Sequence, residues 1–225
     1  MKKYIISCIS LLVGLVIFSS CELDSYDEPT SEISGQVIDA ITGKPLQSQQ
    51  PEGYQINLLE DGYTTPNLFW GKADGTFKNV CLFPLKYEVK PTNGPFVDPA
   101  PQIVVLPKTD LVFTVQPYVN ISGTSAIENG LFKYSMNLKK GAGEKIIEMM
   151  YIISESNQHV SASVFSYRHI LDVSQTPDSE LISNTHSGVI SADEYKYVQG
   201  KIYYIRFAAK TSSSARYNYS EPIKL

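Results

Sequence analysis

The sequence is poor in the side chains from which metal and thiol sites are built, with three cysteines and three histidines in 225 residues. Zinc sites need three or four such ligands close together, and the three histidines have no second His, Cys or acid at ligand spacing. We therefore predict no metal and no cofactor. Runs of Lys and Arg are also absent after residue 3, and the formal net charge is −4. Because a phosphate-binding face needs clustered bases, we expect no nucleic-acid partner.

Charge is scarce too, but apolar residues are not. Charged residues make up 19% of the chain and hydrophobic ones 43%, with 15 Tyr, 9 Phe and 1 Trp. A disordered chain has the opposite balance. The length suffices for one large domain or for two of about 100 residues each.

The N-terminus has an apolar run that is too short to span a bilayer. Lys2 and Lys3 precede the uncharged stretch 4–18, whereas a membrane-spanning helix needs about 20 apolar residues. Two serines and Cys21 follow directly. A basic start, a short apolar run and small residues are the parts of an export signal, so we predict a signal peptide over residues 1–20.

Residues 16–21, Val-Ile-Phe-Ser-Ser-Cys, resemble a lipobox, with Phe18 where Leu is more usual. The resemblance implies that Cys21 is acylated and holds the protein on the outer membrane by lipid. Residues 22–28 contain four acids and no base, which resembles the signal that sends Bacteroidetes lipoproteins to the cell exterior. An ordinary solvated leader is the alternative interpretation of these acids. We predict a flexible acidic tether over 21–30.

Removal of the signal and acylation of Cys21 leave Cys81 as the last thiol. No intramolecular disulfide is then possible, so the exported fold depends on its cores. The apolar alternation over 77–83 predicts that Cys81 is a small buried hydrophobic residue rather than a nucleophile.

After residue 30 no stretch shows a sustained 3.6-residue apolar period. Short β-branched and aromatic runs bounded by Gly, Pro, Asn and Asp recur instead, which predicts an all-β protein. The one helix that we expect is short, over 191–198. The predicted strands are 33–39, 54–59, 67–71, 76–80, 86–90, 102–106, 111–116, 118–122, 131–138, 146–154, 164–171, 187–190, 201–210 and 223–225.

The first half resembles the carboxypeptidase-regulatory-like, or prealbumin-like, β-sandwich. The motifs that carry the resemblance are G-x-V-x-D over 35–39, T-G-x-P-L over 42–46, D-G-T-F over 74–77 and L-x-Y-x-V over 85–89. It implies a sandwich over 31–116 in which these are scaffold residues. Asp-Gly at 74–75 supplies the positive φ of a tight hairpin.

The second half predicts another sandwich. Seven short strands with turn signals after residue 116 are typical of an immunoglobulin-like or fibronectin-type fold, which we place over 117–225. Residues 203–210 and 217–222 resemble the last two strands of the fibronectin type. Alternation directs Tyr203, Ile205, Phe207 and Ala209 to the core and Arg206 to the opposite face.

Candidate catalytic groups are isolated. A glycoside hydrolase needs two carboxylates about 5–10 Å apart across a sugar, whereas the acids at 60–61, 172, 178–180 and 193–194 fall at predicted turns. None of the three histidines, at 159, 169 and 186, lies in a recognisable nucleophile turn. We predict no catalytic residue and no enzyme.

Two aromatic clusters favour binding instead, because sugar rings pack their C–H faces on flat aromatic side chains. The segment 61–70 offers Tyr63, Phe69 and Trp70 in a polar setting, although Phe69 and Trp70 are also candidates for the core or for an interdomain contact. The second cluster is Arg216, Tyr217 and Tyr219. Its alternative role is to pack the corner of the sandwich.

The lipobox, the first sandwich and a second one ending in Arg-Tyr-Asn-Tyr-Ser together resemble a family of uncharacterised Bacteroidetes lipoproteins found beside polysaccharide-import genes. The resemblance implies a non-catalytic surface accessory protein of a glycan-utilisation system. Its partners would be the membrane, a glycan and an outer-membrane transporter complex. The alternatives are a structural spacer or docking protein for a transporter or surface fibre, and a glycoside hydrolase.

Overall fold

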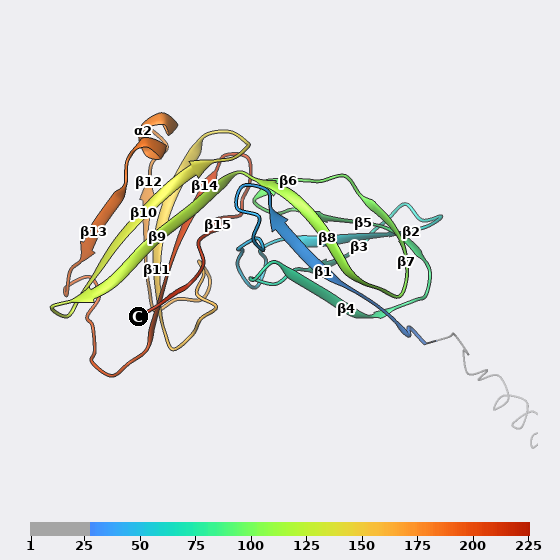
Figure 1. Cartoon of the computed structure of the whole chain (residues 1–225), viewed down its shortest axis with the longest axis horizontal. Helices are drawn as coiled ribbons and strands as arrows, with labels where there is room; N and C mark the ends of the chain where they lie inside the picture. The colour runs from blue at the N-terminus through green and yellow to red at the C-terminus, as the bar shows by residue number, and fades with distance from the viewer. Residues whose placement is uncertain (1–27) are drawn as a thin grey trace, which may run out of the picture.

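The structure, a computed structural model, describes residues 28–225 and consists of two β-sandwiches arranged along the long axis (Figure 1). The predicted all-β architecture of two sandwiches is confirmed. The predicted signal peptide, the lipidation site Cys21 and most of the predicted tether lie outside the described residues. Residues 28–225 contain no helix that could span a bilayer.

The first sandwich packs two four-stranded sheets, with strand orders β4-β1-β8-β6 and β3-β2-β5-β7. β1 pairs in parallel with β8 and antiparallel with β4. Val37, Phe77 and Tyr87, one from each of three scaffold motifs, fill the core between the sheets. The strands are β1 (Ser31–Asp39), β2 (Gln55–Glu60), β3 (Asn67–Trp70), β4 (Thr76–Leu82), β5 (Lys86–Thr92), β6 (Phe96–Val97), β7 (Gln102–Val105) and β8 (Lys108–Pro117).

The Asp74-Gly75 turn forms, but the hairpin predicted around it does not. Gly75 has a φ of 79°, and Asp74 accepts hydrogen bonds from the amide and the hydroxyl of Thr76. However, β3 pairs with β2 and β4 pairs with β1. The turn therefore carries the chain from one sheet to the other, and the amide of Val37 holds it by donating to the Gly75 carbonyl.

Cys81 is exposed, contrary to the prediction. Ser31 lies opposite Leu82 whereas Ile33 lies opposite Asn79, so β4 contains one residue more than β1 over this length. Such a bulge shifts the alternation by one position. Leu82 takes the buried place, and Cys81 faces solvent.

The second sandwich packs the sheet β13-β10-β9 against a sheet in which β12, β11 and β14 are adjacent and both β15 and β16 pair with β14. The predicted inward set Tyr203, Ile205, Phe207 and Ala209 is fully buried, which confirms the alternation. The strands are β9 (Val119–Glu128), β10 (Leu131–Lys140), β11 (Ile146–Glu155), β12 (Tyr167–Asp172), β13 (His186–Ile190), β14 (Tyr203–Thr211), β15 (Asn218–Tyr219) and β16 (Ile223–Lys224).

The helix predicted over 191–198 is wrong. Glu194 accepts hydrogen bonds from Ser191 in a short turn, and the aromatic rings that follow pack on Phe132 of the core. The helix of the described chain is α2 (Asp178–Ser183), which follows Pro177. Acids in its first turn suit the positive end of the helix dipole.

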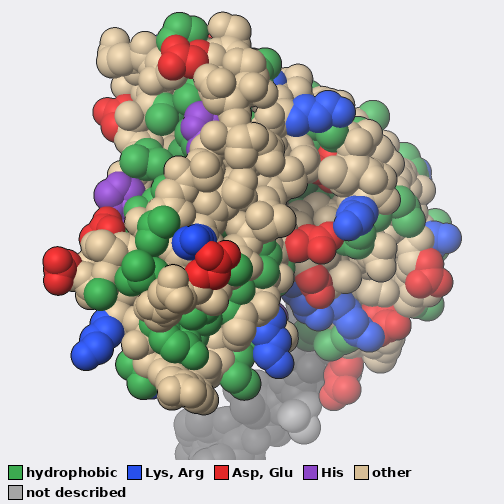
Figure 2. Space-filling view, turned by 60° about the vertical axis from the view of Figure 1, so that its left-hand side comes forward, with side chains coloured by type: hydrophobic (Ala, Val, Ile, Leu, Met, Phe, Trp, Pro, Cys, Tyr) green, Lys and Arg blue, Asp and Glu red, His purple; other side chains and the backbone are tan. Residues whose placement is uncertain are grey.

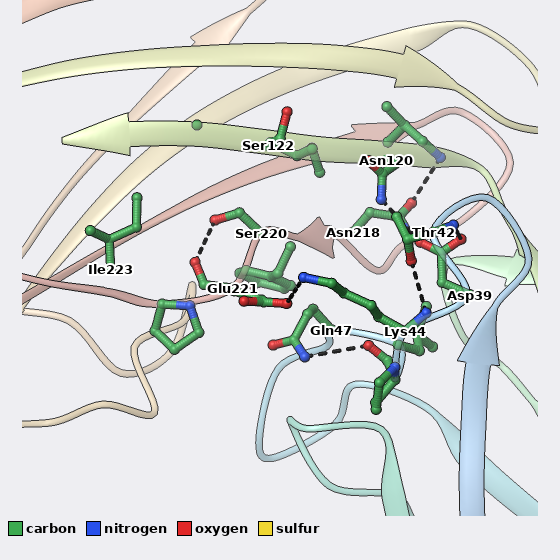
Figure 3. A pocket seen from close by; sticks show the side chains of 17 residues that line it. Asp39, Thr42, Lys44, Gln47, Asn120, Ser122, Asn218, Ser220, Glu221 and Ile223 are labelled. Atoms are coloured by element: carbon green, nitrogen blue, oxygen red, sulfur yellow. Dashed lines mark hydrogen bonds and ion pairs between the residues drawn. The ribbon is translucent and has the colours of Figure 1, made fainter.

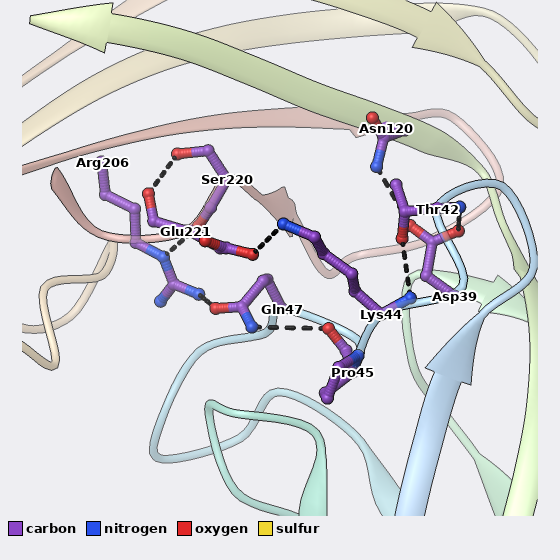
Figure 4. A network of polar contacts seen from close by, with 9 residues as sticks. All are labelled: Asp39, Thr42, Lys44, Pro45, Gln47, Asn120, Arg206, Ser220 and Glu221. Carbon is purple, nitrogen blue, oxygen red and sulfur yellow. Dashed lines mark hydrogen bonds and ion pairs between the residues drawn. The ribbon is translucent and has the colours of Figure 1, made fainter.

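Arg206 joins the two sandwiches from a buried position, with 1% of its surface exposed (Figure 4). Its Nε donates to the Ser220 carbonyl at 2.6 Å and Nη1 to the Val160 carbonyl at 3.2 Å, both in the second sandwich. Across the interface, Nη1 donates to the Ser48 carbonyl at 2.8 Å and Nη2 to Gln47 Oε1 at 3.0 Å. Burial lowers the pKa of Arg206 to about 10, so the side chain remains charged at neutral pH.

Further polar contacts surround this interface. The Asn218 side chain donates to the Pro95 carbonyl at 2.9 Å, and the hydroxyl of Tyr219 donates to Gln49 Oε1 at 2.8 Å. Lys44 and Glu221 form an ion pair of 3.0 Å across it. The two sandwiches therefore meet through satisfied hydrogen bonds rather than through a flexible linker alone.

Candidate functional site

The outer face of the sheet β3-β2-β5-β7 is the candidate binding surface. Ile56, Leu58 and Val89 point into the core, so the alternate residues of the same strands point outward. The pairing aligns these outward residues in cross-strand rows. We call this surface the Trp70 face, and its rows are Trp70-Gln55-Thr92 and Leu68-Asn57-Lys90.

Trp70 is 41% exposed at the corner of this face that adjoins the second sandwich. The guanidinium carbon of Arg216, in the loop between β14 and β15, lies 5.3 Å from the centroid of its ring. Arg216 Nη1 also pairs with Glu52 at 3.2 Å. A cation over an indole ring is attracted by the negative ring face. Because Trp70 belongs to the first sandwich and Arg216 to the second, both sandwiches form this corner.

The loop that holds Arg216 is fixed to the first sandwich. Arg216 N–H donates to Ser214 Oγ at 3.0 Å, and that hydroxyl donates to the Gly94 carbonyl at 3.3 Å. Asn218, which ends the loop, donates to the Pro95 carbonyl. Hydrogen bonds to main-chain carbonyls of the first sandwich, before and after Arg216 in the loop, thus hold it over Trp70.

Amide groups lie beside the indole. Gln55 is directly opposite Trp70, and its Oε1 accepts a hydrogen bond of 2.7 Å from Asn93 Nδ2. The Gln55 amide NH₂ has no partner in the described part of the chain, and Asn93 is exposed. An aromatic face flanked by amide donors and acceptors is suited to hydroxylated rings, whose C–H faces stack while their hydroxyls form hydrogen bonds.

The structure separates the other predicted binding residues from Trp70. Phe69 points to the core, where its ring lies 6.3 Å from that of Phe77. Tyr63 is exposed at the far end of the β2–β3 hairpin, since Trp70 pairs with Gln55 at the near end. Of the first predicted cluster, only Trp70 is exposed next to the second sandwich.

The second predicted cluster divides in the same way. Tyr219 is buried, and the guanidinium of Arg206 lies 4.7 Å from its ring centroid. Tyr217 donates a hydrogen bond to Glu148, and the Lys210 ammonium lies 5.1 Å from its ring. Tyr217 and Tyr219 thus have partners within the protein. The structure brings together one residue from each cluster, Trp70 and Arg216.

A cavity of about 320 Å³ lies between the sandwiches (Figure 3). Its polar groups largely serve the interface. The Asp39 carboxylate accepts from Asn120 and from two main-chain amides, and Lys44 pairs with Glu221. Tyr219 is the one aromatic residue in its lining, and it is buried. The cavity therefore offers no exposed ring on which a sugar can stack.

Two acids with shifted pKa values, Glu148 and Glu155, are held as carboxylates. Burial opposes ionisation of Glu148, but hydrogen bonds from Lys210 and Tyr217 outweigh it and lower its pKa. Hydrogen bonds from Lys201 and Tyr195 lower the pKa of Glu155. A general acid at neutral pH needs a raised pKa instead.

The histidines and surface charges form no metal grouping within residues 28–225. His186 Nε2 lies 2.7 Å from the Leu181 carbonyl, and His169 stacks on Tyr151 with ring centroids 5.1 Å apart. No three His, Cys, Asp or Glu side chains gather there as a metal site. On the face in Figure 2, basic and acidic side chains are interspersed rather than gathered by sign.

Neither a protein-family model nor a curated protein matches the chain. Solved structures do match over most of its length. A DUF3823 family protein from Bacteroides uniformis ATCC 8492 is 21% identical, with a TM-score of 0.73 over 88% of this chain and 99% of that one. A DUF3823 family protein from Parabacteroides merdae ATCC 43184 is 24% identical, with a TM-score of 0.72 over 88% and 100%.

A third solved structure, from Bacteroides uniformis ATCC 8492, is described as a "putative carbohydrate binding protein". It is 22% identical, with a TM-score of 0.69 over 88% of this chain and 99% of that one. Likeness at these identities shows a shared fold of two sandwiches in the same order. It leaves the function to be argued from the site.

Proposed function

We propose that the protein is a non-catalytic carbohydrate-binding protein, anchored by lipid to the outer membrane and facing the cell exterior, which binds glycan on the Trp70 face. The observation that carries the proposal is the exposed indole of Trp70 beside the Gln55 amide, with Arg216 over its ring. In this binding mode a sugar ring stacks on the indole while its hydroxyls exchange hydrogen bonds with Gln55 and Asn93.

The extent of the face favours an extended glycan over a single sugar. The row Trp70-Gln55-Thr92 crosses three strands, and the row Leu68-Asn57-Lys90 lies next to it, so successive sugars of one chain can contact successive rows. One aromatic contact gives modest affinity, because association also costs translational and rotational freedom. Many tethered copies that bind one polysaccharide raise the effective concentration and thus the avidity.

The place in a glycan-utilisation system is part of the same proposal. The lipobox-like segment ending at Cys21 supports surface anchoring, and the carbohydrate-binding description of one structural neighbour supports the ligand class. Capture at the cell surface would supply polysaccharide to an import complex.

A second candidate is a rigid spacer or docking protein for a transporter or surface fibre. The buried Arg206 network favours it, because hydrogen bonds from one guanidinium to both sandwiches fix their relative orientation. Rigidity is useful to a spacer and is not required for binding on one face.

The test is binding of the purified protein to an array of polysaccharides including xylan, mannan, β-glucan, pectin and glycosaminoglycans. We expect Trp70→Ala to weaken binding about tenfold or more, equivalent to about 1.4 kcal/mol. Phe165→Ala is the matched control, since Phe165 is 43% exposed, carries Arg168 at 4.5 Å from its ring and belongs to the second sandwich rather than to the sheet that forms the Trp70 face.

Phe165→Ala should bind like the wild type. Equal loss in the two variants would contradict the assignment to Trp70. Absence of binding to every polysaccharide, together with co-purification of an outer-membrane transporter, would favour the spacer. Release of reducing sugar from any polysaccharide would overturn the non-catalytic assignment.

A further inference from the structure

One end of the first sandwich exposes large apolar side chains that do not belong to its core. Each is between 42% and 65% exposed, and they lie in the β2–β3 turn, in β4, in the β4–β5 connection and at the end of β7. We call this surface the apolar tip, and its residues are Tyr63, Val80, Phe83, Leu85 and Val105.

Main-chain contacts bring these segments together. The amide of Leu106 donates to the Leu85 carbonyl at 3.0 Å, next to Val105. The amide of Asp61 donates to the Lys86 carbonyl at 3.0 Å, which links the turn of Tyr63 to the same connection. These bonds hold the β2–β3 turn, the β4–β5 connection and the end of β7 together at one end of the sandwich, and Val80 lies two residues before Leu82 at the end of β4.

The apolar tip lies where the described chain begins. Ser31, the first residue of β1, is opposite Leu82, one residue before Phe83. Figure 1 shows β1 starting at the end of the first sandwich that is remote from the second one. The proposed lipid on Cys21 lies ten residues before Ser31, and ten extended residues reach at most about 33–36 Å.

Charge around the tip is nearly balanced. Lys78 pairs with Glu32 at 2.8 Å, and Lys86 pairs with Asp61 at 3.2 Å. Because its charges are nearly balanced, binding by this surface does not need an anionic partner. Aromatic rings and lysine stems beside exposed aliphatic side chains are typical of protein surfaces at the membrane interface.

We propose that the apolar tip rests on the phospholipid surface that carries the tether. The proposal rests on the lipid anchoring proposed above, which holds this end within reach of the bilayer and converts a weak contact into an intramolecular one. The contact directs the second sandwich away from the membrane. Trp70 lies at the other end of its hairpin from Tyr63, so the contact also keeps Trp70 clear of lipid.

Cys81 makes the proposal measurable, because it is exposed beside Val80. The acylated full-length protein, with acylation of Cys21 verified by mass, is reconstituted in phosphatidylcholine vesicles and labelled at Cys81 with a polarity-sensitive dye. We expect the emission of the dye to shift to the blue in vesicles. We also expect the iodide quenching constant to be at least about threefold lower than for the same labelled protein in aqueous solution without vesicles. Because the charge at the tip is balanced, both should persist at high salt.

The control label is placed in the second sandwich, with Lys224→Cys in a Cys81→Ser background. It should remain fully accessible to iodide. The double variant Phe83→Ser and Leu85→Ser should expose the Cys81 label, whereas Ile182→Ser, at a comparably exposed apolar residue of α2, should leave it protected. Melting curves confirm that each variant is folded.

Equal quenching at the two labelled positions would overturn the proposal. Protection of the Cys81 label in outer-membrane preparations but not in vesicles would also overturn it, in favour of a protein partner. If Cys21 is not acylated, the anchoring proposal fails, and attachment through an N-terminal histidine tag to nickel-chelating lipid tests the tip separately. Glycan binding of the same samples is measured separately, so that the outcome for glycan binding is kept apart from the outcome for the apolar tip.

Discussion

Replacement of Arg206 by methionine is predicted to weaken the connection between the sandwiches. The variant keeps an apolar stem of about the length of the arginine stem but removes the guanidinium, and with it the donors to three main-chain carbonyls and to Gln47 Oε1. Each buried acceptor left without a donor costs about 1–3 kcal/mol. Removing a buried cation returns several kcal/mol of desolvation.

The balance is a loss of about 3 kcal/mol in the free energy of unfolding. For a chain of this size that corresponds to a melting temperature lower by about 6–12 °C. Two of the four acceptors belong to the first sandwich and two to the second. We therefore also expect the heat-capacity curve of Arg206→Met to separate into two transitions.

The assay is differential scanning calorimetry with Arg168→Met as the control. Arg168 is exposed and contacts only groups of the second sandwich, the Ala162 carbonyl and the Phe165 ring, so its loss should cost less than about 1 kcal/mol. A single transition for Arg206→Met at the wild-type temperature would refute the assignment of Arg206 as the residue that couples the sandwiches.

Three further outcomes follow from the structure. The pKa of Glu148 is lowered in the folded state, so its pairing with Lys210 stabilises the fold above the unfolded pKa of about 4.3 and is lost as the pH falls through the folded value. Urea titrations should show this acid-side loss, under about 1 kcal/mol, in the wild type and not in Glu148→Gln. Gly75→Ala should lower stability by about 1–3 kcal/mol, because φ is 79° and a Cβ would lie 2.7 Å from a main-chain oxygen. Gly43→Ala, with positive φ but open space around it, should lose less, and equal losses in the two melting curves would contradict the steric argument. Cys81 should react with a thiol reagent in the native protein nearly as fast as in denaturant, since it is exposed; strong native protection would contradict the bulge in β4.

Alternation predicted most of the fold because each sheet has one face on a core. The period of two placed Tyr203 and Phe207 inside correctly. It failed at Cys81, where one added residue in β4 reverses the phase and no local signal marks the addition. The Asp-Gly turn was predicted correctly, but which strands pair beside it depends on the parallel β1–β8 arrangement, which is not local.

The candidate site was harder to predict than the fold, because it depends on contacts between residues that are far apart in the sequence. Trp70 and Arg216 were singled out separately, and their meeting depends on how the sandwiches dock. Arg206 was placed on the outer face of its strand, yet residues of the first sandwich cover that face. A single charge in the otherwise uncharged run Tyr-Tyr-Ile-Arg-Phe-Ala-Ala was the available signal, because a buried cation needs several acceptors.

The parallel pairing of β1 with β8 has a mechanical consequence. β1 begins at the end of the first sandwich remote from the second, and β8 leads into the second sandwich at the opposite end. With the lipid anchor that we propose, a force that drags the protein away from the membrane would act on opposite ends of these two strands. Their ladder bonds are then loaded in shear, all at once, rather than peeled one after another. A protein built in this way resists unravelling at its first strand under such a load.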